Sequence, residues 1–289
     1  MAKARDIKKR IGGVSKTRKI THTMEMVATS RMQKWLRVVT SSRPYSENLV
    51  EVLRQLSSAP EASGHPLMEK REHPARVAVM LITSNRGLCG AFNSTINRQA
   101  RELYREYKTQ GLEVELYAVG KKALSFLRHQ DIETAYGNIE VNETCQSDDT
   151  RDIAQMLMDK FLARELDRVE VLYSHYISAG TQEVVTEQLL PISPPRGPER
   201  EERETDFIFE PSAAGIVDSL LPMYVQSTVY RMVTENITSE QVARRRAMKQ
   251  ATDNADEMIT NLTRSYNRQR QAQITSELTE IVGASEALD

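Results

Sequence analysis

Residues 251–282 have the sequence ATDNADEMITNLTRSYNRQRQAQITSELTEIV, and the spacing of their apolar residues decides the fold. Steps of three and four dominate the series Ala251, Ala255, Met258, Leu262, Ile274, Leu278 and Ile281. This spacing is typical of a helix with a narrow apolar stripe, as in a coiled coil. No glycine lies between Ile216 and Val282, and Pro222 is the only proline there. The sequence therefore predicts one helix over 211–289, on the order of 100 Å long.

The first 60 residues carry a similar stripe. It consists of Ile7, Ile11, Val14, Met24, Val27, Met32, Trp35, Val38, Tyr45, Leu49, Val52 and Leu56. Gly12, Gly13 and Pro44 are its expected weak points, and Pro60 and Pro66 should end it. Two amphipathic helices too long for a compact domain must cover their stripes, and each is the simplest partner for the other. We expect an antiparallel pair, because the segment between the helices joins them at one end. The longer C-terminal helix should project as an unpaired tip.

Residues 75–210 show a different pattern, in which strands and helices alternate. The nearly continuous apolar run RVAVMLIT at 76–83 predicts a buried parallel strand. Further strands are expected at 113–119, 169–173 and 181–190, and helices at 91–110, 121–129 and 151–164. Such alternation predicts a Rossmann-like open α/β domain. Residues 191–205 should form an exposed loop, because they are rich in proline and charge. We therefore expect an α/β fold with three parts: a coiled-coil helix at 1–60, the domain at 75–210 and a coiled-coil helix at 211–289.

Charge and composition exclude several classes of protein. The net charge is -1, yet residues 1–43 contain twelve Lys or Arg and only two acidic residues, a local charge of +10. The basic run Lys8-Lys9-Arg10 could contact nucleic acid. No aromatic residues are interleaved with it, however, and an acidic protein partner fits equally well. No apolar run approaches the roughly 20 residues of a membrane span, and no targeting leader is evident, so we expect a soluble chain.

The segment Ser84–Asn93, with the sequence SNRGLCGAFN, is the strongest candidate for a catalytic or cofactor site. It follows the first strand and opens a helix, as a dinucleotide-binding turn does. That motif needs three glycines in G-x-G-x-x-G, and only Gly87 and Gly90 occur here. A Rossmann-like nucleotide-binding enzyme with helical arms is therefore the weaker alternative hypothesis. Neither a catalytic residue nor a cofactor is expected.

Metal and thiol chemistry are not expected either. Cys89 and Cys145 are too few for a disulfide framework or a zinc site, which favours a reducing compartment. No histidine has a spacing that pairs it with Cys89, so a packed thiol is the simpler interpretation. Asp148-Asp149 lies where a helix N-cap belongs, and the acidic run 199–204 is mixed with basic residues. We expect both acidic groups to be solvated, with no metal bound.

Three blocks together resemble the gamma subunit of F-type ATP synthases, the central rotor stalk. The first lies at 10–28 and contains TRKITHTMEMVA, and the second is the Ser84–Asn93 turn. The third comprises AMK and ATDNA within 247–255, followed by YNRQRQAQITSELTEIV at 266–282. The resemblance covers essentially the whole chain, and the last block alone is highly specific.

The resemblance implies a non-catalytic shaft that couples ion flow to ATP synthesis or hydrolysis at catalytic beta subunits. The implied subunit contacts are Met24, Glu25, Arg244, Arg270, Gln271 and Glu280. Met24 would lie near an acidic beta-subunit segment, and Arg270 with Gln271 would hydrogen-bond a beta-subunit loop. The domain's signature turn comprises Arg86, Gly87, Leu88, Cys89 and Gly90.

The implied partners are the alpha and beta subunits, the epsilon subunit and the c-subunit membrane ring. Nucleic acid and direct membrane insertion are not expected. The implied location is peripheral, on the cytoplasmic face of the bacterial inner membrane.

Several residues depart from the family pattern, which suggests a divergent branch. They are Asn85 for Asp, Ala91 for Gly, His22 for a basic residue, Arg245 for Met, and Ala284-Ser285 for Gly-Ala. Chloroplast members carry a cysteine-containing regulatory insertion, whereas no cysteine follows Cys145 here. Thiol switching of that kind is therefore not expected.

Overall fold

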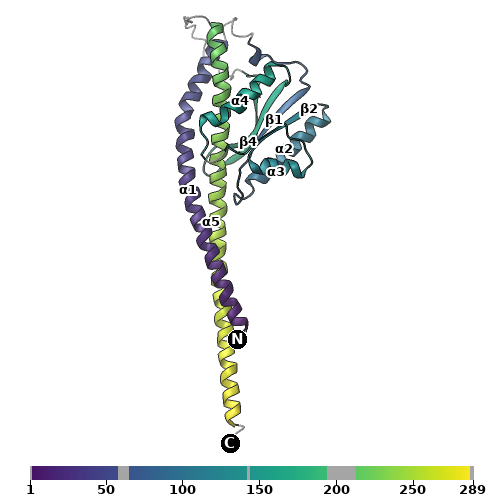
Figure 1. The fold of residues 1–289 in the computed structure, drawn as a ribbon. Coiled ribbons are helices and arrows are strands. Elements are labelled where there is room, and N and C mark those ends of the chain that lie inside the picture. Colours follow the sequence, from purple (N-terminus) through teal and green to yellow (C-terminus); the bar gives the residue numbers. More distant parts are fainter. Residues whose placement is uncertain (1, 58–64, 142–143, 194–212, 287–289) are drawn as a thin grey trace. The chain divides into compact units, whose positions relative to one another are not determined.

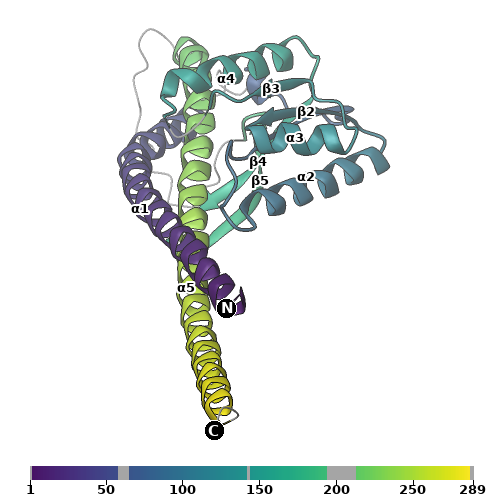
Figure 2. The same cartoon turned by 60° about the horizontal axis from the view of Figure 1, so that its bottom comes forward.

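The computed structural model describes residues 2–57, 65–141, 144–193 and 213–286 (Figures 1 and 2). Helix α1 spans Ala2–Ser57 and helix α5 spans Ala213–Glu286, so both expected terminal helices are confirmed. Each runs through its internal proline, Pro44 in α1 and Pro222 in α5. The chain divides into two compact units, one of residues 30–243 and one of residues 1–29 with 244–289.

The unit of residues 30–243 contains a five-stranded sheet in the order β3-β2-β1-β4-β5. The strands are β1 (Arg76–Ile82), β2 (Glu113–Val119), β3 (Tyr136–Asn138), β4 (Arg168–Tyr176) and β5 (Gln182–Leu190). The helices between them are α2 (Phe92–Thr109), α3 (Lys121–His129) and α4 (Ser147–Leu162), and the short 3-10 helix η1 (Pro66–Met68) precedes β1. The open α/β domain is thereby confirmed. Strand β3 was not predicted, and β5 runs antiparallel to β4 whereas the other pairs are parallel.

Strand β1 lies at the centre of the sheet because both of its faces are apolar. Val77, Val79 and Leu81 belong to a core with residues of α2 and α3. Ala78, Met80 and Ile82 belong to a second core with residues of α1, α4 and α5. A strand covered on both faces reads as a continuous apolar run, which is the pattern at 76–83.

Within the same unit, α1 and α5 pack together through large apolar side chains. Trp35 and Leu53 of α1 share the second core with Val217, Leu221 and Val225 of α5. The buried positions differ by one residue from part of the expected stripe, because Val39 and Leu53 are buried while Val38 is only half-buried and Val52 is exposed. A straight helix drifts by about 20° per heptad against a strict seven-residue repeat, so a seam shifts along the sequence.

In the unit of residues 1–29 and 244–289, α1 and α5 are again paired. Arg18 contacts Asp256 at 3.0 Å, and the Thr252 hydroxyl donates to the Thr21 hydroxyl at 2.8 Å. The α5 number falls as the α1 number rises, so this pair is antiparallel as expected. Its buried seam contains Ala28, Met248, Thr252 and Ala255. Val27 and Met258 were expected in the seam but are exposed, whereas the smaller Ala28 and Ala255 are buried.

The C-terminal part of α5 has apolar residues that this chain does not cover. Ile274, Leu278 and Ile281 are 46%, 58% and 65% exposed. Figures 1 and 2 both show this part of α5 extending past the N-terminal end of α1, as the unequal helix lengths predicted. Among the described residues, no helix combines the length and apolarity needed to cross a bilayer.

Candidate functional site

The signature turn after β1 is held by hydrogen bonds among its own residues. The Asn93 side chain accepts from the Ser84 amide at 3.0 Å and donates to the Cys89 sulfur at 3.1 Å. Leu88 and Gly90 have φ of 62° and 60°, which lets the chain reverse within a few residues. The Leu88 side chain points outward and is 60% exposed, whereas Cys89 is buried. The turn is thus a compact loop with one apolar side chain at its surface.

Asn85 links this turn to two other segments. Its Oδ1 accepts from the Lys121 amide at 2.7 Å, at the start of α3. Its Nδ2 donates to the carbonyl oxygens of Ile139 at 2.8 Å and Val141 at 3.4 Å. An aspartate could not donate to these carbonyls. The departure from Asp at this position therefore has a structural consequence, because Asn85 bonds both segments at once.

Gly120, immediately before α3, allows the close approach of β2 and β1 that positions the turn. Its φ is +103°, and a Cβ at this position would collide with the Thr83 carbonyl oxygen. The Thr83 hydroxyl in turn accepts from the Ala123 amide at 2.8 Å. The carboxyl end of β1 and the start of α3 are therefore fixed to one another.

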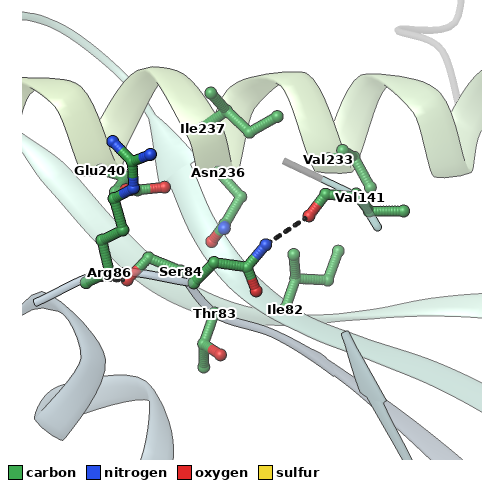
Figure 3. A pocket seen from close by; sticks show the side chains of 10 residues that line it. Ile82, Thr83, Ser84, Arg86, Val141, Val233, Asn236, Ile237 and Glu240 are labelled. Carbon is green, nitrogen blue, oxygen red and sulfur yellow. Dashed lines mark hydrogen bonds between the residues drawn. The ribbon is translucent and has the colours of Figure 1, made fainter. Parts of the chain in front are cut away.

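A cavity lies at the carboxyl end of β1, between the turn and α5 (Figure 3). Its volume is about 250 Å³. Thr83, Ser84 and Arg86 line it from the sheet side, and Asn236 and Glu240 line it from α5. In Figure 3, the Arg86 side chain extends from the turn toward the segment of α5 that carries Glu240.

This cavity is where a doubly wound sheet would hold a dinucleotide. Pockets for small molecules occupy about 300–1,000 Å³, so the space here is small for that ligand. Helix α5 lies across it and adds the buried Glu240 to its lining, a carboxylate that would repel phosphate groups. The geometry thus counts against the alternative hypothesis of a nucleotide-binding enzyme.

Both cysteines are buried thiols without a disulfide bond. Burial, together with the nearby Asp149 carboxylate, raises the pKa of Cys145 to about 12. A thiol with that pKa is protonated at neutral pH and is a poor nucleophile. Asp149 itself accepts from the Gln146 amide at 2.7 Å in a capping box at the start of α4. The described residues contain no cluster of His, Cys, Asp and Glu suited to a metal ion, and the acidic run 199–204 lies outside them.

The expected subunit-contact residues fall into two groups on the unit of residues 1–29 and 244–289. Met24 is 37% exposed and Glu25 is half-buried, with its carboxylate 3.6 Å from the His22 ring. Arg270 and Gln271 are exposed near the end of α5. Because Thr21 is bonded to Thr252, Met24 lies near position 249, about 30 Å along α5 from Arg270.

The two remaining contact candidates differ from these. Arg244 is buried within the chain, so little of its side chain is available to a partner. The side chain of Glu280 lies outside the described residues, as do those of Ala284 and Ser285.

Large apolar residues are exposed on both helices, and the sequence did not separate them from the seam. On α1 these are Ile20, Met26 and Val27, and on α5 they are Met258, Ile274, Leu278 and Ile281. Ile274, Leu278 and Ile281 follow one another at steps of four and three, so they share one helix face, and exposed apolar side chains gathered in this way indicate a surface that binds a partner. The sequence signal for them was weak, because they keep nearly the same spacing as the buried residues.

The fold belongs to a known structural class. The chain resembles one in the central stalk and c-ring structure of Tetrahymena thermophila mitochondrial ATP synthase, with a TM-score of 0.61 and 23% identity. That match covers 80% of this chain and 99% of the other. A chain of the Euglena gracilis mitochondrial ATP synthase, from its OSCP/F1/c-ring structure, gives a TM-score of 0.68 at 19% identity, covering 99% and 95%. The fold is therefore that of the central-stalk subunits of ATP synthases.

Sequence comparison gives the particular family. Residues 3–288 match the family described as ATP synthase. A relative from Leptospira biflexa serovar Patoc, named ATP synthase gamma chain, is 40% identical over 288 residues and matches over the full length of both chains. The chain thus belongs to the family of ATP synthase gamma chains, which confirms the resemblance of the three sequence blocks.

Proposed function

We propose that this chain is the rotating shaft that couples ion flow through the membrane ring to ATP synthesis or hydrolysis, and that it performs no catalysis itself. The catalytic sites would lie on the beta subunits. The complex would be bound at the cytoplasmic face of a bacterial inner membrane, with this chain as a peripheral component.

The observation that carries this proposal is the uncovered apolar stripe near the end of α5. Ile274, Leu278 and Ile281 are largely exposed, and Arg270 and Gln271 directly precede them. Burying apolar surface contributes about 25 cal/mol per Å², so such a stripe favours insertion into a partner. A ring of alpha and beta subunits with an apolar inner surface around this segment would bury the stripe.

The other proposed contacts lie in three parts of the chain. Met24 on the helix 1–60 would lie near an acidic segment of the beta subunit, which the strongly basic residues 1–43 would attract, and Glu25 beside it is a further proposed subunit contact. Opposite charges across an interface guide association and fix orientation. The α/β domain at 75–210 would stand on the c-subunit ring beside the epsilon subunit. The helix 211–289 would carry Arg270, Gln271 and Glu280 toward the catalytic ring, whereas the buried Arg244 is not proposed as a contact.

The test is the double variant Arg270→Ala with Gln271→Ala, studied in the assembled ATP synthase. Both side chains are exposed, so the fold and stability of the chain should not change. We expect impaired ATP synthesis and ATP-driven ion pumping, measured in membrane vesicles. Normal rates of both processes would refute the contact assigned to these two residues.

A matched control removes an arginine and a glutamine from another exposed surface. Arg105 and Gln110, on and just after α2, are both exposed. The variant Arg105→Ala with Gln110→Ala should assemble and work normally. The chain should also co-purify with alpha and beta subunits, whereas ATPase activity of the isolated chain would contradict a non-catalytic role.

A further inference from the structure

Strand β4 extends beyond the end of its neighbour β1. The two strands pair up to Leu81 and Leu172, and β1 ends at Ile82, whereas β4 continues to Tyr176. Strand β5 pairs with the other edge of β4 from Val169 to Tyr176. Near Ser174, the edge facing β1 therefore lacks a strand partner, and an unpaired backbone group would be costly there because Ser174 is buried.

Two side chains of α5 take the place of the missing strand. Asn236 Oδ1 accepts from the Ser174 amide at 3.0 Å, and the Ser239 hydroxyl donates to the Ser174 carbonyl oxygen at 3.0 Å. Both α5 residues are almost fully buried. They are three positions apart and so share one face of the helix. One residue of β4 is thus bonded through both of its backbone groups to a single helix face.

A second set of polar contacts comes from Glu235, which directly precedes Asn236, and from Arg231, just over one turn earlier on α5. The Glu235 carboxylate lies 2.6 Å from Nδ1 of His175, the residue after Ser174. Arg231 contacts Glu187 of β5 at 2.6 Å and donates to the Tyr173 hydroxyl at 3.2 Å. The bonds at Ser174 are therefore flanked by charged contacts to both β4 and β5.

These contacts differ in kind from the apolar packing around them. Apolar burial is non-directional, so it opposes separation of helix and sheet more than sliding between them. Hydrogen bonds require defined distances and angles. The polar side chains therefore constrain the axial position and the rotation of α5 against the sheet more sharply than a non-directional contact does.

We infer that Asn236 and Ser239 are the positioning residues that attach α5 to the α/β sheet, and that force between the two passes through Ser174. The crevice that other doubly wound proteins use for ligands holds a helix here. The force-bearing part of this inference rests on the proposed function, whereas the attachment itself does not.

The attachment is tested on the isolated full-length chain by hydrogen exchange. Asn236→Ala removes the acceptor of the Ser174 amide, so exchange at that amide should accelerate about tenfold. Amides of α2 should keep their rates. The matched control is Thr238→Val, because the buried Thr238 hydroxyl donates to the Thr234 carbonyl oxygen of its own helix, at 2.8 Å, and makes no hydrogen bond to the sheet among the described residues. Unchanged exchange at Ser174 in a folded Asn236→Ala chain would overturn the attachment.

The force-bearing role is tested in the assembled ATP synthase with Asn236→Ala and Ser239→Ala combined. We expect a lower ratio of ion pumping to ATP hydrolysis than with Thr238→Val. An unchanged ratio, together with faster exchange at Ser174, would refute the force path. If the double variant does not fold, Ser239→Ala alone, which loses one hydroxyl, serves for the same comparison. An unmodified chain that supports no coupled turnover would instead refute the proposed function and leave the exchange result intact.

Discussion

Two regions of the single helix α5 have opposite surfaces. Between positions 234 and 241, where α5 packs in the unit of residues 30–243, the buried side chains are mostly polar: Thr234, Glu235, Asn236, Thr238, Ser239, Glu240 and Gln241. Between positions 274 and 281, in the other unit, the large apolar side chains are mostly exposed: Ile274, Leu278 and Ile281. Both arrangements reverse the usual preference for apolar residues inside and polar residues outside.

The contrast shows what each region is built to contact. Buried polar groups persist only where fixed partners satisfy them, and in the first region those partners belong to the chain's own sheet. Exposed apolar groups in a row indicate a partner outside the chain. The permanent attachment and the external contact surface of α5 can therefore be told apart by polarity and burial together.

The largest expected effect comes from the same substitution made in the two regions. Leu221 is 0% exposed and Leu278 is 58% exposed, both on α5. Leu221→Ala should lower the free energy of unfolding by about 2–5 kcal/mol, because it leaves a cavity in a packed core. Leu278→Ala should change it by less than about 0.5 kcal/mol. Urea unfolding of the two variants measures the difference, and equal losses would contradict it.

A second comparison uses ion pairs. Arg231 contacts Glu187 and Glu235 where α5 meets the sheet, whereas the Arg18–Asp256 pair is largely exposed. Arg231→Met should cost about 2 kcal/mol, since it leaves two partly buried carboxylates without their cation. Arg18→Met should cost between about 0 and 1 kcal/mol. Thermal unfolding of both variants shows which of them loses more stability. A larger loss for Arg18→Met would show that the exposed ion pair stabilises this chain more than the partly buried one.

The third comparison concerns carboxylates and pH. Burial tends to raise the pKa of Asp167, but bonds from the Arg76 amide, the Arg71 side chain and the Ala75 amide outweigh it and lower the pKa below 3.8. The ionised form thus stabilises the fold above pH 3.8, and this contribution is lost as pH falls through the lowered pKa. Asp167→Asn should cost about 1.5 kcal/mol at pH 7.

The difference in the free energy of unfolding between the Asp167→Asn variant and the unmodified chain should shrink as the solution is acidified below pH 3.8. A stability difference that stays constant down to pH 2 would rule out this role. Asp256→Asn, at the exposed pair with Arg18, serves as the matched control and should change stability at pH 7 by less than about 0.5 kcal/mol.

The sequence predicted the main elements because their signals are local. The bounds of β2 and α3 were correct, since each is a short periodic segment between glycines or polar turns. Strand β3 was missed because three residues, one of them Gly137, show no period. The direction of β5 was not predicted either. A hairpin and a crossover can present similar strand patterns, and only the short 177–181 connection favours the antiparallel pair.

The residues of the sites were harder to predict than the elements. Met24 and Val27 fit the apolar period yet lie outside the seam, because the contact passes through Ala28. Asn236 and Ser239 continue the spacing of the buried Val225, Val229 and Met232, so the period alone places them on the buried face. Their polar side chains argue against burial, however, and the sequence does not show which groups would bond them. Their bonding depends on where β1 ends relative to β4, which is a property of strand pairing and not of local sequence.

The bond between Thr21 and Thr252 joins residues separated by 231 positions. During synthesis, the apolar face of α1 is therefore made long before its partner on α5 exists. Contacts of such high sequence separation slow folding and leave apolar surface open to aggregation in the meantime. A nascent chain that ends before α5 should consequently depend on chaperones, even if its sheet has already formed.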